Sequence, residues 1–416
     1  MWRILALAAA LTFASPAAQA LAQAADGPPP QGPAADGGGV AVVQLAAPDA
    51  FSTSGRQTGL PQDLWRGASV DTLNAVLPKL AARPLSPAGA ALARRVLATG
   101  APGPQGVGAD PSLLAARADA LAAVGDPKAA AAVLARAPGL DRSPELSRAA
   151  AESALLAGDD ARACAVADAL STGREDVYWL RLRTYCQAIG GHADQAQLTF
   201  DLAQSQVRDP VFGRLMGAKL AGGASPGAAS LRNGLDYALS RSLGLDLSAA
   251  KAAPQVAAAI AAADPEEPAW TIPEGDADRL VAARALASAQ PFSPELLARM
   301  LDAAVKADAA SRPSAQAAAL IVAAYAGTAG PDLRGRLAAL SVPEGKTPAG
   351  RNLALAAAGQ EHLIGETAML ALWSCVDAGP AGLAPAERAR IVQALRLAGL
   401  DADARNFAVE GLLGLP

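Results

Sequence analysis

Serine and lysine occur at two spacings that could form a nucleophilic site. Residues 223–227 read GASPG, the spacing of a nucleophile elbow, whose serine attacks an acyl carbon. That elbow needs a preceding strand and an N–H on the residue after the serine, and Pro226 has no N–H. Ser248 and Lys251 have the spacing of a serine–lysine pair, but the sequence contains no Ser-Asp-Asn element and only a partial third element at Lys346. We interpret both matches as chance in a chain rich in small residues.

The residues that usually hold metals or cofactors are sparse. The chain has only two histidines, His192 and His362. A zinc site needs three or four ligands at suitable spacing, and none is visible. His192 falls in a predicted turn and His362 near a predicted helix start, so we expect surface or capping roles for both. Because no phosphate-binding loop or dinucleotide fingerprint occurs either, the sequence predicts no metal site, no cofactor and no enzyme.

A unit of 33 residues is written three times in the first half of the chain. Each copy has an Ala/Leu-rich run, a glycine, a nearby acidic residue and then an alanine five residues after the glycine. Glycine can end a helix in the left-handed conformation, and an acidic residue favours the start of the next helix. The small alanine lets the two helices approach closely, so each unit predicts a helical hairpin. The three sets are Gly125, Asp126 and Ala130; Gly158, Asp159 and Ala163; and Gly191, Asp194 and Ala196.

This pattern, over residues 112–206, resembles the tetratricopeptide repeat, a helix-turn-helix unit of 34 residues. The Gly-Asp turn and the alanine five residues after the glycine carry the resemblance. The chain departs from the family in its period of 33 and in having alanine or leucine at most of the family's aromatic positions. The resemblance implies an all-α fold, a right-handed superhelical array of antiparallel helix hairpins. Another antiparallel helical array is the alternative.

The resemblance also implies a binding groove, which the first helix of each hairpin lines. Within each hairpin the spacing i, i+3, i+7 places the groove positions on one helix face. Tyrosine and arginine are favoured anchors because they combine contact area with a polar tip. The alternative is that the aromatic residues, Trp179 among them, fill an alanine-rich core. The groove candidates are Glu145, Arg148 and Glu152 in one unit and Tyr178, Arg181 and Tyr185 in the next.

Residues 1–20 have the features of a secretory signal peptide. One positive charge at Arg3 precedes an apolar core over residues 4–14, and residues 18–20 fit the A-x-A cleavage pattern. That core is too short for a permanent anchor, and no later segment has 18 apolar residues without charges or breakers. We therefore expect a cleaved signal peptide, a periplasmic location and no transmembrane segment in the mature chain.

The composition favours helices and excludes one class of partner. Apolar residues make up 52% of the chain but aromatic residues only 4%, and alanine, the best helix former, dominates. Residues that favour strands are sparse, which argues against a large sheet. The formal charge is −4 and no basic patch is visible, so we expect no nucleic-acid partner.

The three cysteines favour a disulfide, because exported chains meet oxidising conditions. Cys164 falls on the second helix of one predicted hairpin and Cys186 on the first helix of the next. Such helices pack together in a solenoid, so this pair is a candidate disulfide. The alternative is that both are small buried residues in an alanine-rich core. Cys375 would remain unpaired.

Shifts in composition predict the domain organisation. Residues 21–58 contain Pro-Pro-Pro and Gly-Gly-Gly runs and are expected to form a flexible linker, with order starting near Leu64. Residues 59–264 are predicted to form an N-terminal helical repeat region and residues 276–416 a C-terminal helical region. Prolines around Trp270 mark the boundary between them.

Our leading hypothesis is a non-enzymatic scaffold or adaptor of the bacterial envelope, which holds an envelope protein or a peptide segment in the groove. The sequence is similar overall to uncharacterised periplasmic proteins of alphaproteobacteria, which implies no activity. One alternative is a peptidoglycan turnover factor, because soluble lytic transglycosylases also carry an alanine-rich superhelix. Their catalytic domain begins at a Glu-Ser pair, and here Glu152-Ser153 lies inside the repeat. A purely structural oligomer is the other alternative.

Overall fold

The chain is all-helical over the residues that the structure describes. The computed structural model describes residues 48–222, 225–261, 268–291, 293–327 and 330–416. In these ranges it forms nineteen α-helices and no strand, and Leu231 and Ala252 make an isolated bridge. The expected all-α class is therefore confirmed. The predicted signal peptide and residues 21–47 of the predicted linker lie outside the described ranges.

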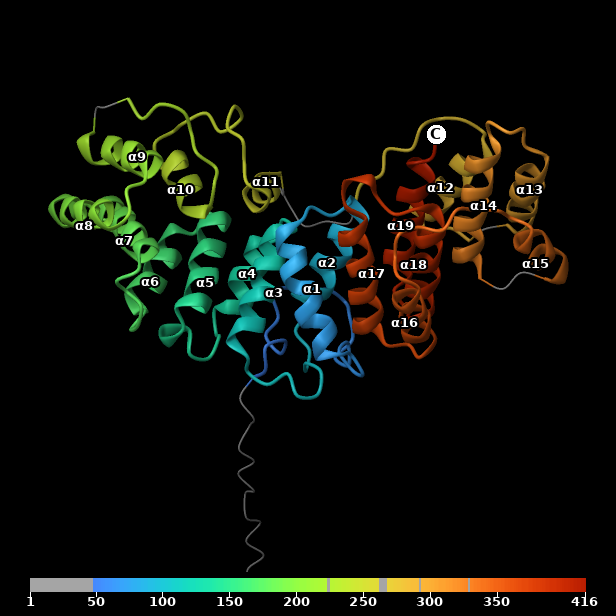
Figure 1. The fold of residues 1–416 in the computed structure, drawn as a ribbon, viewed down its shortest axis with the longest axis horizontal. Coiled ribbons are helices and arrows are strands. Elements are labelled where there is room, and N and C mark those ends of the chain that lie inside the picture. Colours follow the sequence, from blue (N-terminus) through green and yellow to red (C-terminus); the bar gives the residue numbers. More distant parts are fainter. Residues whose placement is uncertain (1–47, 223–224, 262–267, 292, 328–329) are drawn as a thin grey trace, which may run out of the picture. The chain divides into compact units, whose positions relative to one another are not determined.

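The helices follow one another through short turns and loops (Figure 1). The first eleven are α1 (Val70–Ala82), α2 (Pro87–Ala98), α3 (Pro111–Ala123), α4 (Pro127–Leu134), α5 (Pro144–Ala157), α6 (Asp160–Ala169), α7 (Val177–Ile189), α8 (Ala193–Gln206), α9 (Pro210–Ala221), α10 (Gly234–Ser242) and α11 (Pro254–Ala261). The last eight are α12 (Asp278–Ala287), α13 (Pro294–Lys306), α14 (Arg312–Ala326), α15 (Pro331–Ala338), α16 (Ala349–Gln360), α17 (Ile364–Ala378), α18 (Pro385–Leu397) and α19 (Asp401–Leu413).

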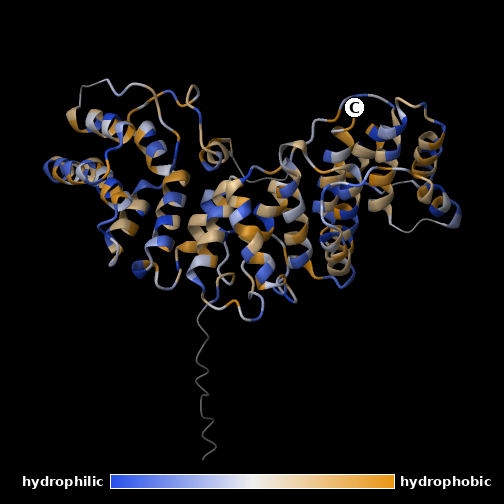
Figure 2. Ribbon diagram, viewed as in Figure 1, coloured by the Kyte–Doolittle hydropathy of each residue, from blue (hydrophilic) through white to orange (hydrophobic). Residues whose placement is uncertain are grey.

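Most helices carry both hydrophilic and hydrophobic residues, as Figure 2 shows. Each helix can then bury an apolar face and leave a polar face in water. Among the described helices, none combines the length and the apolar character that a membrane crossing requires.

Local capping explains where the helices of the predicted hairpins begin and end. Gly125, Gly158 and Gly191 have φ angles of 87°, 81° and 80°, the left-handed region that glycine adopts without strain. The Asp126 side chain accepts a hydrogen bond from the Ala129 N–H at the start of α4, and Asp159 caps α6 in the same way. The predicted hairpins α3/α4, α5/α6 and α7/α8 are therefore present.

Several helices pack against helices that are distant from them in the sequence. α1 packs against α3, which packs against α5, and α5 packs against α6. On its other side α1 contacts α17, and α2 contacts both α17 and α19, so helices of the predicted C-terminal region continue the packing from the first two helices (Figure 1). Residues 47–416 group as one unit by their contacts. The division into residues 59–264 and 276–416 stays a prediction.

Order begins earlier than the sequence predicts, because residues 48–58 of the expected linker are held against the helices. Phe51 is fully buried, and its ring centroid lies 4.7 Å from that of Trp65. The guanidinium group of Arg117 on α3, also fully buried, lies 5.2 Å from the Phe51 ring. It donates hydrogen bonds to four backbone carbonyls, those of Ala50, Thr53, Leu97 and Thr99, at 2.8–3.0 Å.

The structure contains a disulfide between Cys164 and Cys186, whose Cα atoms are 5.5 Å apart. It joins α6 to α7, which are successive helices of two neighbouring hairpins. Cys375 is free and buried, and burial raises the pKa of its thiol to about 12. That thiol therefore stays protonated and unreactive at neutral pH.

We expect Arg117→Ala to lower the free energy of unfolding by about 3–5 kcal/mol, because it leaves four buried carbonyls without their donors. Urea unfolding followed by far-UV circular dichroism measures this. Arg136→Ala, at an exposed position on the loop after α4, is the matched control and should change little. Equal unfolding midpoints for the two variants would contradict the anchoring role of Arg117.

Reduction of the disulfide should lower the free energy of unfolding by about 3 kcal/mol, the chain-entropy value for cysteines 22 residues apart. The measurement compares urea midpoints with and without dithiothreitol. A variant with both Cys164→Ser and Cys186→Ser should start at the lower midpoint and show no response to the reductant. A full response in that variant would mean that the effect comes from elsewhere.

Candidate functional site

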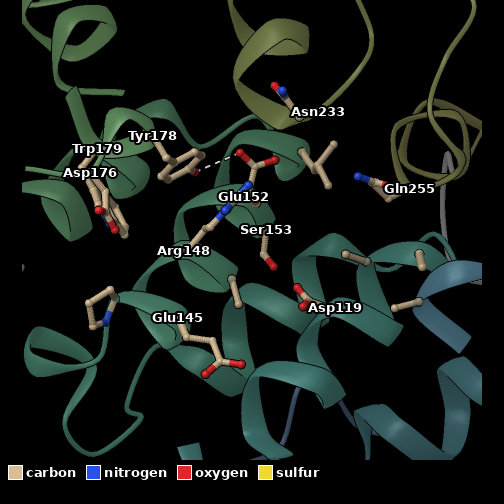
Figure 3. Close-up of a pocket in the computed structure, with 16 residues that line it drawn as sticks. Asp119, Glu145, Arg148, Glu152, Ser153, Asp176, Tyr178, Trp179, Asn233 and Gln255 are labelled. Atoms are coloured by element: carbon tan, nitrogen blue, oxygen red, sulfur yellow. Dashed lines mark hydrogen bonds between the residues drawn. The ribbon is translucent and has the colours of Figure 1, made fainter. Parts of the chain in front are cut away.

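A pocket of about 570 Å³ lies among α1, α3, α5 and α7, with residues of α10 and α11 at its border (Figure 3). Four of the six predicted groove residues line it: Glu145, Arg148, Glu152 and Tyr178. The first three follow one another on α5 at the spacing i, i+3, i+7, which places them on one helix face. We call this cavity the acidic pocket, because four carboxylates and one guanidinium line it. The carboxylates belong to Asp119, Glu145, Glu152 and Asp176.

Glu152 joins three helices at the back of the acidic pocket. Its carboxylate accepts a hydrogen bond of 2.6 Å from the Gly234 N–H on α10 and one of 2.9 Å from the Tyr178 hydroxyl on α7. A Cβ at Gly234 would lie 2.7 Å from the Glu152 carboxylate, so only glycine allows this approach. Burial raises the pKa of Glu152, and burial together with the neighbouring Glu152 raises that of Tyr178.

Arg148 lies over the face of the Tyr178 ring, with its guanidinium carbon 4.6 Å from the ring centroid. Its side chain is exposed to the pocket. In the described chain no carboxylate lies within 4.0 Å of it, although Asp119 and Glu152 are near enough for their pKa values to respond to its charge. Arg148 therefore keeps its N–H donors available.

Asp119 projects from α3 into the acidic pocket and is held by no hydrogen bond or ion pair among the described residues. Its pKa is raised to about 6. The largest cause is the loss of water against the pocket walls; the charge of Glu145 adds to it, and that of Arg148 opposes it. Asp119 remains exposed to solvent through the pocket opening, so it is accessible to a ligand.

Ser153 is the buried polar residue of the acidic pocket. It is 1% exposed, and its hydroxyl points into the pocket from α5 on the side of Asp119 (Figure 3). Within the described ranges this hydroxyl makes no hydrogen bond. Most buried hydroxyl groups in proteins have a hydrogen-bond partner. Ser153 therefore offers a donor and an acceptor to whatever enters the pocket.

Arg181 and Tyr185 lie outside the acidic pocket, which differs from the groove prediction. Tyr185 is fully buried, and its hydroxyl donates to Asp160 at 3.1 Å, so the core alternative describes it. Arg181 forms an ion pair of 3.3 Å with Asp209 and lies 5.5 Å from the Phe212 ring. The spacing predicts which residues share a helix face, but it does not predict that α6 and α9 pack against α7.

The sequence analysis missed Asp119, although the repeat could have located it. Asp119 precedes Glu152 by 33 residues, and Tyr185 follows Glu152 by the same interval. All three therefore occupy the same position of the predicted unit. Asn233, the residue that caps the start of α10, and Gln255 on α11 also line the pocket, and these helices follow the repeats and share no phase with them. No sequence signal pointed to these two residues.

Two further cavities adjoin the acidic pocket. One, of about 440 Å³, shares Ala81, Asp119 and Glu145 with it. The other, of about 610 Å³, shares Ala81 and Ala123. We call the three cavities together the groove. Its length along α1, α3 and α5 suits an extended ligand better than a compact one.

The described residues contain no group of three metal-ligating side chains that could hold an ion. His192 lies at the turn before α8, as predicted, and is exposed. His362 lies in the turn between α16 and α17, where its Nδ1 atom is 2.6 Å from the Leu397 carbonyl oxygen. The two histidines therefore have the turn and surface positions that the sequence favoured.

Comparison of the chain with protein-family models, with curated proteins and with solved structures gives no match. The acidic pocket is therefore the feature of the molecule that bears on its function. Three of its residues have no hydrogen-bond or ion-pair partner in the described chain: Asp119, Arg148 and Ser153.

We expect Asp119→Asn to stabilise the protein at pH 7.5 but not at pH 3.5. Between the ordinary pKa of 3.8 and the folded value of about 6, the folded state holds the proton more tightly than the unfolded state. Stability is therefore lost as the pH rises through this window, and asparagine avoids the loss. Because the Asp119 side chain is exposed, the substitution should raise the free energy of unfolding by about 1 kcal/mol, which is less than the free-energy equivalent of the whole pKa shift.

The measurement compares urea midpoints of the two proteins across that pH range. Asp332→Asn, at an exposed position on α15, removes the same charge away from the groove and should give no pH-dependent difference. A gain that is equal at both pH values would show that the Asp119 charge is not the cause.

Proposed function

We propose that this protein is an exported, non-enzymatic scaffold or adaptor that binds a segment of a cell-envelope protein in its groove. The observation that carries the proposal is the acidic pocket, where Asp119, Arg148 and Ser153 have no hydrogen-bond or ion-pair partner in the described chain. Buried polar side chains are normally paired within the protein, and Ser153, which is 1% exposed, is not. Polar side chains that lack a partner in the protein and line a concave surface can bind an external ligand.

The groove favours a peptide over a small metabolite as that ligand. Its three adjoining cavities expose side chains from successive helices, so an extended chain could contact several of them at once. We propose that the helices form a right-handed tetratricopeptide-like solenoid. The support is the common turn geometry of Gly125, Gly158 and Gly191 and the shared position of Asp119 and Glu152 in the predicted unit.

Two observations support an exported, periplasmic location. The first is the predicted signal peptide over residues 1–20. The second is the disulfide between Cys164 and Cys186, because disulfides persist in oxidising compartments and are rare in the reducing cytosol. The two observations are independent, since the disulfide depends on the packing of α6 against α7.

A photo-crosslinking experiment in the native cells tests the proposal. A benzoylphenylalanine at position 74, on the exposed edge of the groove, should capture one dominant envelope protein, and the same group at position 332 should not. Arg148→Ala should weaken the adduct because it removes the guanidinium N–H donors that the pocket offers to a ligand. Thermal unfolding of the variant checks that it is folded.

Two results would count against the proposal. An adduct that forms equally with and without Arg148→Ala would mean that the groove does not hold the partner. Release of soluble muropeptides from purified peptidoglycan by the mature protein would refute the non-enzymatic assignment and favour the turnover alternative.

A further inference from the structure

The charges of the groove select the kind of ligand it can take. The acidic pocket has four carboxylates against one guanidinium, and the adjoining 440 Å³ cavity adds Asp110 and no basic residue. An anionic segment would meet repulsion from most of this surface. The third cavity of the groove is lined by Arg83 and Arg94 and by no carboxylate. The complementarity to a positively charged ligand therefore belongs to the acidic pocket and the 440 Å³ cavity.

Asp119, Glu145 and Asp176 are the carboxylates that remain free to bind such a ligand, and of these Asp119 and Glu145 are the two whose charges interact. Glu152 is already held by the Gly234 N–H and the Tyr178 hydroxyl. Asp119 has no partner in the described chain, and Glu145 has only a hydrogen bond of 3.3 Å from the Ser112 hydroxyl. The charge of Glu145 raises the pKa of Asp119, although the charge of Arg148 lowers it by more. The two carboxylates repel each other, and a second cation bound between them would add to the effect of Arg148.

Ser153 gives an independent indication of a hydrogen-bonding ligand. Its hydroxyl is buried, lacks a partner in the described chain and points into the pocket beside Asp119 (Figure 3). An N–H donor of the ligand would satisfy it. Because the described residues provide no three-ligand metal group, an organic cation fits this place better than a metal ion.

Arg148 limits where the cation can bind. It lies against the Tyr178 ring, 4.6 Å from the centroid, so the aromatic face on that side is already occupied. A second cation is therefore directed away from Arg148, toward Asp119 and Glu145 on the facing helices α3 and α5. The free N–H donors of Arg148 are then available to a backbone carbonyl of the same ligand.

We propose that the acidic pocket binds a lysine or arginine side chain of the partner segment between Asp119 and Glu145, with the Ser153 hydroxyl as a further acceptor. This inference rests on the proposed function and specifies the chemistry of the partner. The acidic pocket thus selects a segment of an envelope protein that places a basic residue there over one with a neutral or acidic residue.

The test uses three fluorescein-labelled, end-blocked decapeptides that differ at two positions, with lysine, glutamine or glutamate there, and fluorescence anisotropy with the mature protein. The lysine peptide should bind at least about tenfold more tightly than the glutamine peptide. The double variant Asp119→Asn with Glu145→Gln should abolish this preference, and Asp332→Asn should retain it. The preference should also weaken as the pH falls from 7.5 to 5.5, because Asp119 takes up a proton near pH 6 in the field of Glu145, Glu152 and Arg148.

Equal binding of the lysine and glutamine peptides would overturn the inference, as would a preference that survives in the double variant. Binding of none of the three peptides would also overturn it. The crosslink from position 74 separates the two proposals: an adduct with an envelope protein, without a preference for lysine peptides, retains the adaptor function and rejects only the basic ligand. Loss of the crosslink as well would reject both.

Discussion

The described structure depends on one buried charge that has no carboxylate partner in contact. The Arg117 guanidinium donates to four backbone carbonyls, which belong to residues 50–53 and to the end of α2, and so it fixes α3 to the segments on either side. Burial lowers its pKa to about 9, which still leaves it charged at neutral pH. Because α3 also contacts α1 and α5, the position of the acidic pocket follows from this anchoring.

The polar groups of the protein fall into two contrasting sets. Between α1–α2 and α17–α19 the buried charges are paired: Arg95 bonds to Asp403, and Glu366 accepts from the Ser69 N–H and the Thr72 hydroxyl at 2.9 Å. An alanine-rich core offers small side chains and limited apolar area, so such bonds fix which helices meet. In the acidic pocket Asp119 and Ser153 are left without partners in the described chain. Near α17 the buried Thr367 hydroxyl and Trp65 indole N–H have no hydrogen-bond partner either, so the open charge of Asp119 is what distinguishes the acidic pocket.

Sequence patterns predicted what depends on local chemistry. The all-α class, the hairpin turns at Gly125, Gly158 and Gly191 and the face of α5 that bears Glu145, Arg148 and Glu152 follow from residue type and spacing. Residue type and spacing did not predict the contacts between segments that are distant in the sequence. A single phenylalanine in a Pro/Gly-rich stretch gives no periodic signal, so the burial of Phe51 was missed. Arg181 and Tyr185 have the same spacing as the α5 trio, but neighbouring helices cover them.

The packing of α1 against α17 has a consequence for biosynthesis. The hydrogen bond between Ser69 and Glu366 joins residues 297 positions apart, so the first helices leave the ribosome long before their partners exist. Until then α1 and α2 expose apolar faces that the finished protein buries, and contacts of such long range form slowly. A chain that stops before α17 would keep these faces open. Quality-control proteases would then recognise unfinished copies by their first helices rather than by their broken ends.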